Sequence, residues 1–270
     1  AALDKELYNQ NSRVNTTPGY MKVTGFPIRD FSNYGTLDLA GILRKSSNVG
    51  ASKIALSMQA PDLWKAFKSY GFGEHPGVSF PASSAGYFNH YSNWQPLDQA
   101  TMAFGYGLSV STLQLARSYA LFANEGRLQD VSLIRLDKAQ ASSTVMKAST
   151  AKLVLEMMEE VVGPKGSDQQ AAIPGYRVAG KTGTAKKNIA GGYLEDSYVA
   201  VFAGVVPVSN PRLVMAVMIN EPRQNGYYGG IVAAPVFKEV LTHALRLMNI
   251  SPDDLPSDGE VVRVATRSDL

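Results

Sequence analysis

The chain has 270 residues, of which 45% are hydrophobic and 18% charged, and its formal net charge is +3. These values are ordinary for a globular protein of one large domain or two small ones, and without a basic run they do not favour nucleic-acid binding. The lack of cysteine excludes disulfides, thiolate nucleophiles and cysteine-ligated metals, and the three histidines lie far apart, so neither a metal nor a cofactor is expected.

All but one of the helices expected from the sequence lie in the first 162 residues. Residues 1–7 are good helix formers without a preceding cap and are interpreted as the end of a helix that begins upstream. Residues 8–34 are rich in Asn, Thr, Gly and Pro, which predicts a loop with a hairpin, and 72–96 is expected to be long and irregular. The other expected helices are 37–43 (capped by Thr36), 51–58, 62–70, 98–104, 111–124 and 150–162 (capped by Ser149).

The strand signals lie between residues 128 and 219. Residues 128–136 alternate like a strand, and two strongly apolar strands, 198–206 and 213–219, are joined by a hairpin loop. A final helix is expected over 231–248, and the acidic, polar tail 251–270 is expected to be loose. A block of helices followed by antiparallel strands predicts an α+β fold.

Residues 175–184 match two catalytic signatures that need different structures. Residues 175–182 match G-x-x-x-x-G-K-[ST], the phosphate-binding loop of nucleotide hydrolases, which needs a buried strand before it and a helix opening at the lysine. The polar, punctuated stretch 169–175 and the residues after Gly183 fit neither requirement. Residues 181–184 match K-T-G-T, the strand motif of penicillin-binding proteins and β-lactamases, and the alternation over 176–181 favours this second interpretation.

A second polar motif lies where two of the expected helices meet end to end. Ser46, Ser47 and Asn48 place hydroxyl and amide groups at a helix terminus, where backbone donors are also unpaired. An ordinary helix cap is one interpretation. The arrangement is also S-x-N, which enzymes with a K-T-G strand need on the opposite side of their cleft.

Four segments, 45–50 (KSSNVG), 104–110 (FGYGLSV), 181–187 (KTGTAKK) and 227–237 (YYGG to APVF), occur in this order. Together they closely resemble the transpeptidase domain of class B penicillin-binding proteins, most of all the septal, division-specific peptidoglycan D,D-transpeptidase of Gram-negative bacteria. The resemblance covers nearly all of the chain. It implies a penicillin-binding protein/serine β-lactamase-like α+β fold: an antiparallel sheet with helices on both faces and a helical subdomain.

The resemblance also implies catalytic roles for three residues. Acyl transfer from a peptide needs a nucleophilic hydroxyl, a base, a proton donor for the leaving amine and donors for the oxyanion. Ser46 would relay a proton to the leaving amine, and Asn48 would hold the substrate amide and the base. Lys181 would complete the electrostatic network.

Five further residues are expected, by the same resemblance, to contact the substrate. Thr182 and Thr184 would bind its terminal carboxylate, and the Thr184 backbone N–H would be one oxyanion donor. Gly183 would let the substrate backbone lie close to the strand. Tyr227 and Tyr228 would wall the cleft, with packing under a Gly-rich loop as the alternative.

One element of the family, the nucleophile motif S-x-x-K, is absent from its expected place. The only S-x-x-K runs from Ser149 to Lys152, after S-x-N rather than before it, and Ser149 reads as a helix cap. In the family the serine helix comes just ahead of the segment with which this chain begins. The expectation is therefore that residues 1–270 are the C-terminal part of one transpeptidase domain, that no nucleophile lies in them, and that they are inactive alone.

The leading hypothesis is a serine-type D,D-transpeptidase that cross-links peptidoglycan stem peptides through an acyl-enzyme and is the target of β-lactams. By resemblance its partners would be cell-division and glycan-polymerising proteins, and it would act at the periplasmic face of the inner membrane, with a membrane anchor upstream. The alternatives are a carboxypeptidase or β-lactamase on the same fold, a non-catalytic β-lactam-binding or division scaffold, and a phosphate-loop nucleotide hydrolase.

Overall fold

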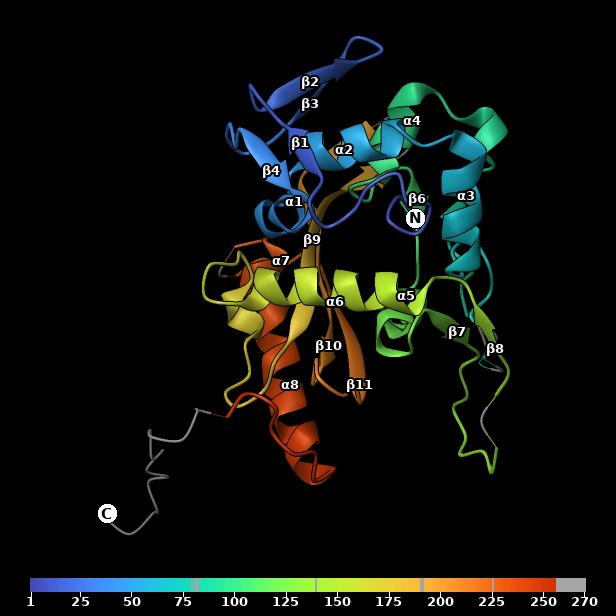
Figure 1. The fold of residues 1–270 in the computed structure, drawn as a ribbon, viewed down its shortest axis with the longest axis vertical. Helices are drawn as coiled ribbons and strands as arrows, with labels where there is room; N and C mark the ends of the chain where they lie inside the picture. Colours follow the sequence, from blue (N-terminus) through green and yellow to red (C-terminus); the bar gives the residue numbers. More distant parts are fainter. Residues whose placement is uncertain (79, 81–82, 139, 190–191, 225, 256–270) are drawn as a thin grey trace, which may run out of the picture.

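A three-stranded antiparallel sheet in the order β11-β10-β9 forms the centre of the molecule (Figure 1). Its strands are β9 (Ala179–Ile189), β10 (Gly192–Val206) and β11 (Leu213–Asn220), and Lys181 pairs with Ala203 while Val205 pairs with Val214. The computed structural model describes residues 1–78, 80, 83–138, 140–189, 192–224 and 226–255. Within the described residues β9 is an edge of the sheet, so one side of its backbone is not paired with a strand.

Helices cover both faces of this sheet because successive side chains of β10 point to opposite sides. Phe202 and Val206 pack with helix α8 (Ala234–Leu247), where the ring centroids of Phe202 and Phe237 are 4.7 Å apart. Val205 packs in a second cluster with Leu155 and Met158 of helix α6. Helices α5 (Thr112–Ala123) and α6 (Ala148–Val162) cover that second face, and α6 crosses in front of the strands in Figure 1. The predicted α+β fold with helices on both faces is confirmed.

A helical subdomain lies above the sheet in Figure 1. It contains α1 (Leu39–Lys45), α2 (Asn48–Leu56), α3 (Ala60–Ser69) and α4 (Pro96–Met102). Three short pairs of strands flank these helices: β1 (Arg13–Asn15) with β4 (Thr36–Asp38), β2 (Tyr20–Val23) with β3 (Phe26–Arg29), and β5 (Tyr87–Phe88) with β6 (Leu108–Ser109). A fourth pair, β7 (Arg127–Gln129) with β8 (Ser142–Thr144), lies beside α5. The remaining short helices are η1 (Tyr91–Asn93), η2 (Gln169–Ala171) and α7 (Gly229–Val232). The hairpin expected within 8–34 is β2–β3.

Several expected element ends were wrong. Thr36 lies in β4, and Asp38 caps α1 instead, because its side chain accepts a hydrogen bond from the backbone N–H of Gly41. Ser149 is not a cap, since α6 begins at Ala148 after Lys147. The strand expected over 128–136 is confined to β7, which ends at Gln129. A local capping pattern identifies a helix terminus only to within a few residues, because tertiary contacts decide which polar side chain is used.

The two ends of the described chain are held by hydrogen bonds. Residues 1–7 form one turn, in which Glu6 has φ 60° and Leu7 N–H donates to Ala2 O, the hydrogen-bond pattern with which helices end. Near the other end, Asp253 accepts hydrogen bonds from the backbone N–H groups of Arg177 and Ser209, so the chain is fixed there although it was expected to be loose from Ser251. Residues 256–270 of that expected tail lie outside the described residues.

No helix within the described ranges has the length and apolarity that a membrane crossing requires.

Candidate active site

A cleft of about 790 Å³ separates the edge strand β9 from the junction between α1 and α2. Its other walls come from residues 103–106, from 167–170 and from the start of α7. Seven of the eight site residues predicted from the sequence line it: Ser46, Asn48, Lys181, Thr182, Gly183, Thr184 and Tyr228. The structure therefore brings the S-x-N and K-T-G-T motifs, 135 residues apart from Ser46 to Lys181 (181 − 46 = 135), to opposite walls of one cleft.

Ser46 ends α1 in the left-handed conformation, with φ 53° and ψ 44°. Few residues other than glycine adopt this conformation, and such strain is often found at functional sites. The side chain is exposed, and within the described residues its hydroxyl makes no hydrogen bond to another group. Two residues on, Asn48 opens α2 and its Nδ2 donates to Arg29 O at 3.0 Å. Ser46 thus presents an unpartnered hydroxyl to the cleft, beside an amide that is held by the β2–β3 hairpin.

Ser47 and Asp30 fix this junction from beneath. The Ser47 Oγ accepts from Gly50 N at 2.9 Å, which caps α2, and donates to Asp30 Oδ2 at 2.6 Å. The other Asp30 oxygen accepts from Val49 N at 2.9 Å. The sequence had offered a helix cap among Ser46, Ser47 and Asn48, and Ser47 is that cap, whereas Asp30 was missed. Nothing near Asp30 in the sequence signals a contact 17 residues away.

Lys181 stands on β9 with only 17% of its side chain exposed. Its Nζ lies 3.2 Å from both Thr182 O and Thr182 Oγ1, and 3.8 Å from Asp168 Oδ2. Burial lowers the pKa of Lys181 below its ordinary value, because the ammonium loses water, and the neighbouring Asp168 carboxylate opposes this shift. The cleft therefore holds a poorly hydrated cation opposite the Ser46 hydroxyl.

The backbone of β9 is also exposed to the cleft. Thr182 N donates to Asp168 Oδ2 rather than to β10, so the N–H groups of Thr182 and Thr184 both point away from the sheet. At Gly183, an added Cβ would meet only Val201 Cβ, at 3.8 Å, which leaves room for a ligand. At Gly229, an added Cβ would lie 2.3 Å from Val201 O, so only glycine lets the start of α7 approach the sheet this closely.

Residues 1–242 match the penicillin binding protein transpeptidase domain. The chain belongs to this family. It is 40% identical over 263 residues to the probable peptidoglycan D,D-transpeptidase PenA of Neisseria flavescens, a match that covers 97% of this chain and 65% of that protein. It is 41% identical over 254 residues to the peptidoglycan D,D-transpeptidase FtsI of Escherichia coli strain K12, covering 94% of this chain and 43% of that protein.

A solved structure agrees with these sequence relatives. The apo transpeptidase domain of Burkholderia pseudomallei penicillin-binding protein 3 superposes with a TM-score of 0.90 at 42% identity, over 94% of this chain and 77% of that chain. The resemblance and the penicillin-binding protein fold expected from the sequence are thereby confirmed. The chain spans about 43% to 65% of the length of the two curated relatives named above.

The structure of this penicillin-binding protein domain contradicts two competing interpretations, the phosphate-binding loop at 175–182 and the nucleophile at Ser149. Lys181 lies inside an extended strand and not at a helix N-terminus, so the phosphate-loop interpretation was wrong. Ser149 and Lys152 lie on α6 and do not line the cleft, and the Lys152 side chain is 79% exposed. Ser149 therefore has neither the position nor the buried lysine that a nucleophile in this cleft needs.

The two tyrosines of the family-like segment lie in different surroundings. Tyr228 lines the cleft and is 51% exposed. Tyr227 does not line it, since its ring stacks on Tyr198 with centroids 4.0 Å apart. Their hydroxyl oxygens are 3.2 Å apart, so Tyr227 supports Tyr228 from the side of the sheet.

Proposed function

We propose that this chain forms most of the catalytic domain of a peptidoglycan D,D-transpeptidase, which cross-links stem peptides through an acyl-enzyme and is acylated by β-lactams. The observation that carries the proposal is the placement of Ser46 and Asn48 across one cleft from Lys181 and Thr184. Hydroxyl, amide, ammonium and outward backbone N–H groups supply the proton donor and the oxyanion donors that acyl transfer from a peptide requires, and the nucleophile has to come from elsewhere.

In this proposal the groups have different tasks. Ser46 relays a proton to the leaving amine, Lys181 completes the electrostatic network with its positive charge, and Asn48 holds the substrate amide and the base. The N–H of Thr184 is one donor to the oxyanion, a contact whose removal typically costs about a hundred- to a thousand-fold in rate. The open side of β9 and the space over Gly183 support binding of the substrate backbone alongside the strand.

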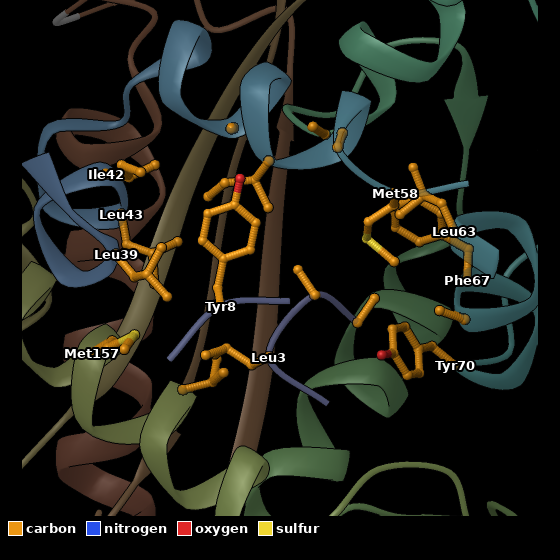
Figure 2. A pocket seen from close by; sticks show the side chains of 18 residues that line it. Leu3, Tyr8, Leu39, Ile42, Leu43, Met58, Leu63, Phe67, Tyr70 and Met157 are labelled. Carbon is orange, nitrogen blue, oxygen red and sulfur yellow. The ribbon is translucent and has the colours of Figure 1, made fainter. Parts of the chain in front are cut away.

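The nucleophile comes, in our proposal, from a helix that seats in a second, apolar cavity. This cavity measures about 300 Å³, and its walls face each other in Figure 2: Leu39, Ile42, Leu43 and Met157 on one side, and Met58, Leu63, Phe67 and Tyr70 on the other, with Leu3 and Tyr8 between them. Four residues, Ile42, Leu43, Ala51 and Ala103, line both the cavity and the cleft. A serine on a helix in this cavity could therefore reach the groups described above.

The test uses the full-length protein and a fluorescent penicillin. The expected result is a covalent label that Ser46→Ala slows by at least about a hundred-fold, since a proton-transfer group contributes roughly 10²- to 10⁴-fold. Ser149→Ala is the matched control and should leave labelling unchanged. Absence of a label on the unaltered protein would rule out the proposal.

Rates with two substrates distinguish the neighbouring alternatives. Fast turnover of a chromogenic cephalosporin would indicate a β-lactamase, and release of the terminal residue from a stem peptide without cross-linking would indicate a carboxypeptidase.

The proposal also places the protein at the periplasmic face of the inner membrane, with an anchor upstream and cell-division and glycan-polymerising proteins as partners.

A further inference from the structure

Asp168 is a charged residue in the interior that the mechanism above does not use. Only 3% of its side chain is exposed, and in the described part of the chain no other charged residue is buried to this extent. It precedes η2 and lies against β9 at the cleft wall. Because burying a carboxylate is costly unless it is well paired, its partners indicate its role.

The partners of Asp168 are the first two residues of the K-T-G-T motif. Its Oδ2 accepts from Thr182 N at 2.9 Å, and its Oδ1 accepts from Thr182 Oγ1 at 3.0 Å. A carboxylate can only accept, so the single hydroxyl proton of Thr182 is donated to Asp168. Lys181 Nζ donates to the same Thr182 oxygen at 3.2 Å. The Thr182 hydroxyl therefore has no proton left for a ligand.

Thr184 is in the opposite situation. Its Oγ1 accepts a hydrogen bond from Gly229 N at 3.0 Å, which leaves its own proton to be donated. No acceptor for that proton is recorded within the described ranges, and the residue lines the cleft. Of the two threonines, Thr184 is thus the one ready to donate to an anionic ligand.

We infer that Asp168 is a specificity-determining residue, which withholds the Thr182 hydroxyl from the substrate and leaves Thr184 as the hydroxyl donor to its terminal carboxylate. This inference rests on the proposed function. It changes the expectation from the sequence, in which both threonines bind the carboxylate. Asp168 also places a negative charge beside the site for the terminal carboxylate of the substrate. The cleft should therefore bind carboxylate-bearing ligands more weakly than it would without that charge.

Asp168→Asn tests the inference because it should increase the rate of acylation. The Thr182 backbone N–H needs an acceptor, so the asparagine oxygen should turn toward it and the amide NH₂ should face Thr182 Oγ1. The NH₂ then donates to the hydroxyl oxygen, and the hydroxyl proton is released toward the cleft. In the full-length protein, acylation by benzylpenicillin, which bears a carboxylate, should become about five-fold faster or more, since a hydrogen bond to a charged group is worth more than a neutral one.

Thr182→Val separates hydroxyl release from simple removal of charge. In the Thr182→Val background, Asp168→Asn should give no gain, because there is no hydroxyl to release. An equal gain in both backgrounds, or no gain in a variant with an unchanged circular dichroism spectrum, would overturn the inference. If Asp168→Asn does not fold, Thr184→Val and Thr182→Val are compared in the otherwise unchanged protein. We expect Thr184→Val to slow acylation by about ten-fold or more and Thr182→Val by less than about three-fold, and similar slowing by both would overturn the inference.

Failure of the proposed function has a different signature. Unaltered protein that no penicillin labels would contradict the transpeptidase proposal, and the inference would fall with it. Normal labelling of the unaltered protein combined with no effect of Asp168→Asn would contradict the role of Asp168 alone.

Discussion

Lys181 combines a charge with a site from which most water is excluded. Its ordinary pKa is 10.5, and burial lowers the pKa in the folded protein, with Asp168 opposing the shift. The ammonium is therefore lost as pH rises through a value below 10.5. If this charge supports acylation, the rate of penicillin labelling should fall on its alkaline side at a pH below 10.5, which a pH–rate profile measures.

Lys181→Arg is the control for the fall in labelling rate at alkaline pH, because a guanidinium stays charged up to and beyond pH 10.5. The labelling rate of the arginine variant should no longer fall at alkaline pH, even if it is lower at every pH. An unchanged fall would contradict its assignment to Lys181. The effect on stability has the opposite sign. Between the folded and unfolded pKa values of the lysine the unfolded chain binds more protons, so the unfolding free energy should rise with pH in that window.

Ser46 combines an unfavourable backbone conformation with an exposed hydroxyl. A residue with a Cβ pays about 1–2 kcal/mol in the left-handed conformation, which glycine avoids. Ser46→Gly should therefore raise the unfolding free energy by about 0.5–1 kcal/mol over Ser46→Ala, while both variants lose penicillin labelling. Denaturant unfolding of the two variants measures the difference, and equal stabilities would show that the conformation carries no strain.

At the scale of elements, the α1–α2 junction depends on a carboxylate from the hairpin. Asp30 holds Ser47 Oγ and Val49 N, which cap α2 and aim Asn48. Asp30→Ala should cost about 2 kcal/mol or more, because it leaves these donors without their charged acceptor. It should also slow labelling, since the S-x-N residues lose their support.

Asp130→Ala is the matched control. Asp130 accepts from Arg117 at 2.8 Å, but its side chain is 55% exposed. A pair of this kind contributes at most about 1 kcal/mol. Thermal or denaturant unfolding compares the two variants. An Asp30→Ala variant as stable as Asp130→Ala would show that the α1–α2 junction does not depend on the Asp30 carboxylate.

Elements with an internal pattern were predictable from the sequence, and contacts between elements were not. The apolar runs of β10 and β11 and the alternation into K-T-G-T identified the sheet, because side-chain period reflects burial directly. The cap Asp38 was missed, since several polar residues compete at each helix start. Asp30 and Asp168 act across 17 and 14 residues, and such distances have no local sequence signal.

At the scale of the whole molecule, the two walls of the cleft belong to different parts of the fold. Lys181 and Thr184 are fixed by the sheet, whereas Ser46 and Asn48 are fixed by the helical subdomain. The apolar cavity lies between that subdomain, which lines it with α1, α2 and α3, and helix α6 on the face of the sheet (Figure 2). What fills the cavity therefore sets the distance between the two halves of the site.

The cavity is large compared with the stability of a domain. At roughly 24 cal/mol per Å³ of empty apolar volume, it would cost about 7 kcal/mol if left open, which is similar to the whole stability of many domains. The 270-residue chain alone should therefore be poorly soluble and bind hydrophobic dyes, and the protein extended upstream, with a helix in the cavity, should not. A stable, monomeric preparation of the 270-residue chain that binds no dye would contradict this.

Ala66→Leu tests whether a helix fills the cavity, because its effect on the unfolding free energy should have opposite signs in the 270-residue chain and in the extended protein. Ala66 lines the cavity from α3, so in the 270-residue chain the added carbons should fill empty space and raise the unfolding free energy by about 1 kcal/mol. In the extended protein the same carbons should clash with the seated helix and lower it by about 1–3 kcal/mol. Ala148→Leu, at an exposed position of α6, should change either protein by less than about 0.5 kcal/mol. Stabilisation by Ala66→Leu in both proteins would mean that the cavity stays empty in the extended one, and the nucleophile would then have to reach the cleft by another route.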